Sequence, residues 1–121
     1  MAKILIVEDD PDITRLMARQ LSLAGHHVFV AIDAYQGINQ VRKERPDLVV
    51  LDLKMPAGGG ISVLRSIRTS LLYNFTPVVV VTALEDQELK KQVTELGVKS
   101  YLQKPLENGT LVQAVKDALE N

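Results

Sequence analysis

The sequence of 121 residues contains no cysteine and no tryptophan, and its only histidines are the adjacent pair His26 and His27. Without cysteine the chain has no disulfide framework, no cysteine-ligated zinc or iron–sulfur site and no thiol chemistry. A histidine-based metal site or a Ser-His-Asp triad would have to use that one pair. The candidate chemistry is therefore narrowed mainly to carboxylates, hydroxyls and amines.

The chain also lacks a long apolar segment and an excess of charge. No run of about 18 apolar residues is present, so we expect no membrane span. The acidic run Glu8–Asp9–Asp10 is unlike a signal peptide, and we expect a cytoplasmic protein. Fourteen basic and fifteen acidic side chains give a net charge of −1, which argues against direct nucleic-acid binding through bulk charge. The length predicts a single domain over 1–121.

Short apolar runs alternate along the chain with amphipathic ones. Strands are predicted at 4–7, 28–30, 48–51, 78–81 and 101–102, and helical spacing of apolar residues follows each of them, at 13–21, 38–41, 61–67, 89–96 and 111–119. Continuous β-branched runs such as Val78–Val81 are typical of central strands in a parallel sheet. The order predicts an α/β fold, a doubly wound (βα)5 flavodoxin-like arrangement. Its five-stranded parallel sheet has the order 2-1-3-4-5, with helices on both faces.

Polar residues follow four of these strands. In a doubly wound sheet the site lies at the carboxyl ends of the strands, beside the switch point between strands 1 and 3. The residues at these ends are Glu8, Asp9 and Asp10 after the first strand, Asp52 after the third, Thr82 and Ala83 after the fourth, and Lys104 and Pro105 after the fifth. Three carboxylates in one small site repel one another unless a cation neutralises them, and Mg²⁺ suits a site that also receives a phosphate.

The combination of acids, lysine and hydroxyl describes a phosphoryl-transfer site, where positioning and charge neutralisation matter most. A carboxylate can itself be the nucleophile and become an acyl phosphate. Asp52 is the best candidate, because it stands alone at the end of the middle strand.

Four stretches, 4–10, 47–56, 81–83 and 101–105, together resemble the receiver domain of bacterial two-component response regulators, of the chemotaxis-regulator type. The resemblance implies that Asp52 is the phosphoacceptor. It implies that Asp9, Asp52 and the backbone carbonyl of Lys54 bind Mg²⁺ or Mn²⁺, with Glu8 acting through a water. It further implies that Thr82, Ala83 and Lys104 bind the phosphoryl oxygens, that Tyr101 changes rotamer when Thr82 shifts, and that Lys104–Pro105 is a cis peptide.

The implied function is a phosphorylation-activated switch. A sensor histidine kinase or phosphotransfer protein would supply the phosphoryl group, and the face of helix 4, strand 5 and helix 5 would change. An unidentified downstream protein or output domain would read this change, and a phosphorylation-dependent homodimer is a further candidate. The chain would not be an enzyme beyond its own phosphorylation and dephosphorylation. The implied dephosphorylation-tuning residues, Lys54 and Leu84, cannot accept a hydrogen bond from a water, so slow loss of the phosphoryl group is expected.

Two alternatives belong to other functional classes. A Mg-dependent phosphohydrolase with an aspartyl-phosphate intermediate would need a second acid two residues after the nucleophile, where Lys54 stands. A flavodoxin-like cofactor binder would need Ser, Thr and Gly after the first strand, where Glu8–Asp9–Asp10 would repel a phosphate.

Two loop segments carry weaker predictions. The run Gly58–Gly60 is interpreted as a flexible turn into the third helix. The segment 71–75 is apolar for a loop, and we expect it to fold back onto the core, with a partner surface as the lesser option.

Overall fold

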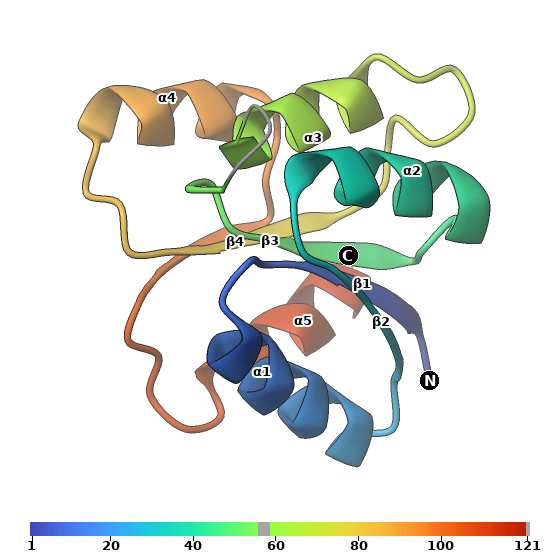
Figure 1. Ribbon diagram of the computed structural model, residues 1–121, viewed down its shortest axis with the longest axis vertical. Helices are drawn as coiled ribbons and strands as arrows, with labels where there is room; N and C mark the ends of the chain where they lie inside the picture. Colours follow the sequence, from blue (N-terminus) through green and yellow to red (C-terminus); the bar gives the residue numbers. More distant parts are fainter. Residues whose placement is uncertain (56–58, 121) are drawn as a thin grey trace.

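The computed structural model describes residues 1–55 and 59–120 (Figure 1). Within these residues strands and helices alternate strictly: β1 Lys3–Val7, α1 Pro11–Leu23, β2 His27–Ala31, α2 Ala34–Glu44, β3 Leu48–Leu51, α3 Gly59–Arg68, β4 Val78–Thr82, α4 Gln87–Glu95, β5 Ser100–Gln103 and α5 Thr110–Glu120. The strands form one parallel sheet in the order β2-β1-β3-β4-β5. The predicted fold is confirmed, including the edge positions of β2 and β5.

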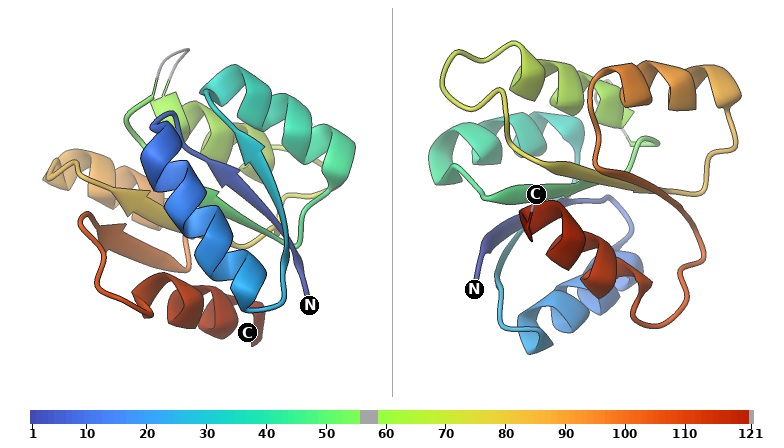
Figure 2. Two further views of the ribbon diagram at one scale, coloured as in Figure 1. Left: turned by 60° about the horizontal axis from the view of Figure 1, so that its bottom comes forward. Right: turned by 180° about the vertical axis from the view of Figure 1, so that it is seen from behind.

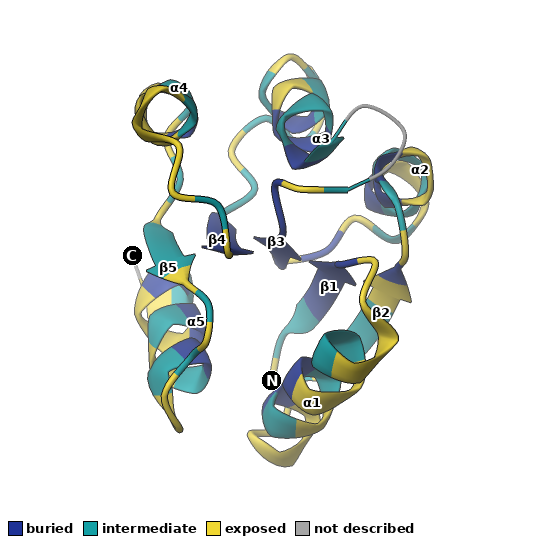
Figure 3. Ribbon diagram, turned by 60° about the vertical axis from the view of Figure 1, so that its left-hand side comes forward, coloured by how far each residue is buried: buried dark blue, intermediate teal, exposed yellow. Residues whose placement is uncertain are grey.

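The sheet separates two layers of helices. Helices α1 and α5 cover one face, and α2, α3 and α4 cover the other (Figures 1 and 2). Successive strand residues point to opposite faces, so Ile4 and Ile6 pack toward α1 and α5 while Leu5 and Val7 pack toward the other layer. Strands β3 and β4 are buried from end to end, and β1 is buried except at Lys3 (Figure 3), which explains why their sequences are continuous apolar runs.

Three helices begin with an aspartate that caps the first turn. Asp10 accepts hydrogen bonds from the N–H groups of Asp12 and Ile13 at the start of α1. Asp33 and Asp86 accept from backbone N–H groups in the first turns of α2 and α4. Such caps satisfy N–H groups that have no partner inside the helix. Each capped start follows the carboxyl end of a strand, so the caps also fix the loops at that edge of the sheet.

The start of α3 corrects one prediction. Gly58 lies outside the described residues, but Gly59 and Gly60 form the first turn of the helix. A Cβ atom on Gly60 would overlap the backbone oxygen of Asp52 and lie 2.8 Å from the Cα of Leu53. The Gly60 N–H also donates to the Leu53 oxygen at 2.9 Å. The interpretation as a flexible turn is therefore wrong for Gly60, where close approach to the strand end requires glycine.

The loop between α3 and β4 differs from the prediction made for segment 71–75. The side chains of Leu71, Leu72 and Phe75 are 96%, 73% and 92% exposed, so the prediction that this segment folds back onto the core is wrong for them. Only Tyr73 of the large apolar residues in this segment packs against the core, and the Arg45 guanidinium lies 5.2 Å from its ring centroid.

Arg68, the last residue of α3, ties this loop to the end of α4. Its guanidinium donates to the backbone oxygens of Asn74 at 3.0 Å and Thr76 at 2.7 Å on one side. On the other side it donates to Leu96 at 2.6 Å and Gly97 at 3.3 Å. Burial lowers the pKa of Arg68. These bonds fix the main chain of the loop, and its other apolar side chains are left facing outward.

Candidate functional site

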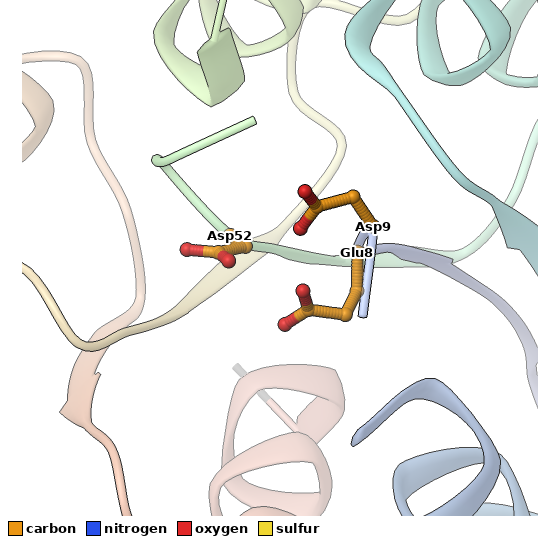
Figure 4. A group of neighbouring side chains, drawn as sticks. All are labelled: Glu8, Asp9 and Asp52. Carbon is orange, nitrogen blue, oxygen red and sulfur yellow. The ribbon is translucent and has the colours of Figure 1, made fainter. Parts of the chain in front are cut away.

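Three carboxylates meet at the carboxyl ends of β1 and β3. Glu8 and Asp9 follow β1 and extend toward the side on which Asp52 lies (Figure 4). One oxygen from each of the three lies within 4.8 Å of the others. Glu8 and Asp52 are buried, with 1% and 5% exposure, whereas Asp9 faces solvent. The predicted convergence of these acids is present in the structure.

Lys104, which follows β5, reaches across the sheet edge to two of the acids. Its Nζ lies 2.5 Å from Glu8 Oε1 and 3.1 Å from Asp52 Oδ2. Glu8 Oε2 accepts from the N–H of Asp10 at 3.1 Å, and Asp52 Oδ1 accepts from the N–H of Lys54 at 3.2 Å. Each buried carboxylate is thus hydrogen-bonded through both of its oxygens.

The electrostatics of this group follow from its burial. Desolvation raises the pKa of Glu8, against the lowering effect of its hydrogen bond to Lys104. Burial alone would lower the pKa of Lys104, but its hydrogen bonds to Glu8 and Asp52 outweigh burial and raise that pKa. Lys104 therefore carries its positive charge at neutral pH.

The donor set fits a hard divalent cation. With all three acids ionised, three carboxylates against one ammonium leave an excess of negative charge in a small, partly buried volume. Carboxylate oxygens are the ligands that Mg²⁺ and Mn²⁺ take, and Asp9 presents its carboxylate to solvent, where a hydrated ion arrives.

Thr82 is the last residue of β4, the strand that pairs with β3 in the sheet. Thr82 is fully buried, and its Oγ1 accepts a hydrogen bond from the N–H of Leu84 at 3.3 Å. Tyr101 Oη donates to the backbone oxygen of Leu84 at 3.3 Å. The Lys104 N–H donates to the Thr82 oxygen at 2.8 Å, and the Lys104–Pro105 peptide is cis.

An open cavity of about 710 Å³ lies over the carboxylates, with Lys54, Ala83 and Lys104 among its lining residues. Leu84 and Tyr101 line a different cavity of about 280 Å³. The structure thus brings most predicted site residues together, but Leu84 and Tyr101 line this second cavity and not the one over the carboxylates. Gln103 also lines the second cavity, and no motif in the sequence predicted a role for it. Its one signal was its place at the end of a strand, next to Lys104.

Comparisons with known proteins agree with this geometry. The family model described as "Response regulator receiver domain" matches residues 4–116. The transcriptional regulatory protein PrrA of Mycobacterium tuberculosis is 34% identical over 117 residues, which cover 97% of this chain and 49% of PrrA. Protein PilH of Pseudomonas aeruginosa is 31% identical over 119 residues, which cover 98% of each chain.

A solved structure supports the same relationship. The chemotaxis response regulator CheY4 of Vibrio cholerae matches with a TM-score of 0.89 at 29% identity and with 98% of each chain covered. The chain spans about half the length of curated relatives such as PrrA, and nearly the full length of PilH. In the described part of the chain no helix is both long and apolar enough to cross a bilayer.

Proposed function

The chain belongs to the response regulator receiver domain family, and on that basis we propose that it is a switch activated by phosphorylation of Asp52. The observation that carries the proposal is the meeting of Glu8, Asp9, Asp52 and Lys104 at one edge of the sheet. A sensor histidine kinase or a phosphotransfer protein would be the donor. A downstream protein or an output domain would read the modified state.

In the proposed reaction an Asp52 carboxylate oxygen attacks the phosphorus of a phosphohistidine. The new O–P bond forms as the N–P bond breaks, and the leaving imidazole takes up a proton. Asp9, Asp52 and the backbone carbonyl of Lys54 would hold Mg²⁺ or Mn²⁺, with Glu8 acting through a water. When bound, the ion supplies charge neutralisation at the incoming phosphoryl oxygens.

The residues of this chain orient and neutralise the phosphoryl group. Lys104 already contacts an Asp52 oxygen, so its ammonium lies where a phosphoryl group on that oxygen would develop charge. The Thr82 hydroxyl and the Ala83 N–H would donate to the other phosphoryl oxygens. A phosphoryl group adds about −1.5 to −2 charges at a partly buried edge, so the surrounding groups must rearrange around it.

The proposed output face is formed by α4, β5 and α5. Tyr101 connects it to the site, since its Oη donates to Leu84 in the loop that follows Thr82. Burial and the nearby Asp86 and Asp52 carboxylates raise the pKa of Tyr101, so its hydroxyl stays protonated as a donor. Movement of Thr82 toward a phosphoryl oxygen would displace the Leu84 oxygen and change the position of the ring.

Intact mass after incubation with acetyl phosphate tests the proposal. We expect one phosphoryl adduct that requires Mg²⁺ and is absent from Asp52→Asn. Asp47→Asn is the matched control, because Asp47 stands at the opposite end of β3, where it accepts from the Lys3 N–H. An adduct that persists in Asp52→Asn, or in excess chelator, would refute the assignment. Sustained hydrolysis of phosphate esters would favour a phosphohydrolase instead.

A further inference from the structure

Gln103, the last residue of β5, holds two consecutive carbonyls of the β4–α4 loop. Its Nε2 donates to the backbone oxygen of Ala83 at 3.1 Å and to that of Leu84 at 3.3 Å. The strand register places Gln103 opposite Thr82, directly beside the start of this loop. A side-chain amide nitrogen carries two hydrogens, so one glutamine can make both bonds.

The peptide group between Ala83 and Leu84 is held at both ends. Its oxygen accepts from Gln103, and its N–H, which belongs to Leu84, donates to Thr82 Oγ1 at 3.3 Å. Because a peptide group is planar, fixing the oxygen also fixes the direction of the N–H. The Thr82 hydroxyl therefore accepts a bond of defined direction, which leaves its own proton available as a donor.

The next peptide group joins Tyr101 to the same arrangement. The Leu84 oxygen accepts from both Gln103 Nε2 and Tyr101 Oη, which its two lone pairs allow. Gln103 therefore links the Thr82 hydroxyl and the Tyr101 ring through one short segment of backbone.

We propose that Gln103 is a positioning residue that orients the Thr82 hydroxyl for phosphoryl binding. The inference rests on the proposed function at Asp52. Gln103 is not among the residues that line the cavity over the carboxylates, so it acts through the loop and not by touching the phosphoryl group. Its side chain is exposed, so replacing it leaves the apolar core unchanged.

A double-mutant cycle with beryllium fluoride, a phosphoryl mimic, tests this role. Gln103→Met keeps the length of the side chain but cannot donate a hydrogen bond. In the presence of Mg²⁺ we expect about two- to tenfold weaker beryllium fluoride binding, as for the loss of one neutral hydrogen bond. In a Thr82→Ala background the same substitution should have no further effect, because the hydroxyl that it orients is gone.

Three controls accompany the cycle. Gln103→Lys keeps a donor and should retain most of the affinity, and Gln113→Met changes an exposed glutamine of α5 and should have no effect. Mg²⁺ affinity without the mimic should stay the same in Gln103→Met.

Hydrogen exchange gives a second, independent readout. Without any phosphoryl group or mimic bound, exchange of the Leu84 amide should be faster in Gln103→Met than in the original sequence, and this readout does not depend on phosphoryl binding.

The inference would be overturned if Gln103→Met weakened beryllium fluoride binding equally with Thr82 and with Thr82→Ala, or weakened it in neither case. Unchanged exchange of the Leu84 amide would also overturn it, since the loop would then not depend on Gln103. If the unsubstituted protein does not bind beryllium fluoride at all, both the proposed function and this inference are refuted. A failure confined to the Gln103 comparison overturns this inference alone.

Discussion

A single methyl group at Gly60 should reverse the usual effect of replacing a helical glycine. In an open helix Gly→Ala stabilises by about 1 kcal/mol through helix propensity. At Gly60 the new Cβ would overlap the Asp52 oxygen and lie 2.8 Å from both the carbonyl carbon of Asp52 and the Cα of Leu53. These are backbone atoms at the end of a buried strand, and overpacking of this kind costs about 1–3 kcal/mol or more. We expect Gly60→Ala to destabilise by about 1–3 kcal/mol.

Gly37→Ala is the matched comparison. Gly37 is also buried within a helix, but there a Cβ would meet only side-chain methyl groups of Val7, at 3.0 and 3.3 Å, and of Val63, at 3.4 Å. Methyl groups can shift by a few tenths of an ångström, so the propensity gain should offset most of the cost.

Urea unfolding measures both variants. With a slope of about 1–3 kcal/mol/M, the midpoint of Gly60→Ala should fall clearly below that of Gly37→Ala. Phosphorylation of Asp52 should slow in Gly60→Ala, because the clash displaces the backbone that carries this carboxylate. Equal midpoints for the two variants, or a more stable Gly60→Ala, would refute the reasoning.

Three further predictions concern the site itself. Lys104→Ala should keep or raise Mg²⁺ affinity, because a competing positive charge is gone, while the response to phosphorylation is lost; a titration showing weaker Mg²⁺ binding would contradict this. Lys54→Asn combined with Leu84→Glu should speed decay of the phosphorylated form. The new asparagine and glutamate oxygens can accept a hydrogen bond from the attacking water, whereas the lysine and leucine side chains cannot. Unchanged or slower decay in the double variant would count against the argument. Burial raises the pKa of Glu8, so the folded chain binds this proton more tightly than the unfolded chain, and the Glu8 contribution to stability should fall as pH rises above 4.5. Unfolding free energies of Glu8→Gln, compared with the original sequence across that pH range, should lack this loss.

The sequence predicted the fold and the meeting of the acids for a definite physical reason. Parallel strands place their carboxyl ends at one edge, so knowing that Glu8, Asp52 and Lys104 each follow a strand is enough to bring them together. The same reasoning failed for Gly60 and for Leu71, Leu72 and Phe75. Those outcomes depend on the approach of one backbone to another and on which carbonyls Arg68 holds, and neither leaves a periodic signal in the sequence.

The role of Gln103 could not be predicted from the sequence, for a related reason. A glutamine at the end of an edge strand is compatible with simple exposure to solvent. Its contacts with Ala83 and Leu84 depend on the register that pairs Gln103 with Thr82 and on the path of the loop that follows Thr82. Side chains that act through main-chain carbonyls are hard to find by motif, since every residue offers the same acceptor.

The bonds of Arg68 to Leu96 and Gly97 have a mechanical consequence for α4. Val93 is the one residue of this helix that is buried, so few apolar contacts oppose its movement. Arg68 anchors the chain just beyond its carboxyl end, while its amino end joins the loop that Thr82 begins. A helix fastened at one end and pushed at the other rotates as a lever about the fastened end. Small displacements beside Asp52 would then move the amino-terminal end of α4 more than its carboxyl end, with Arg68 as the pivot.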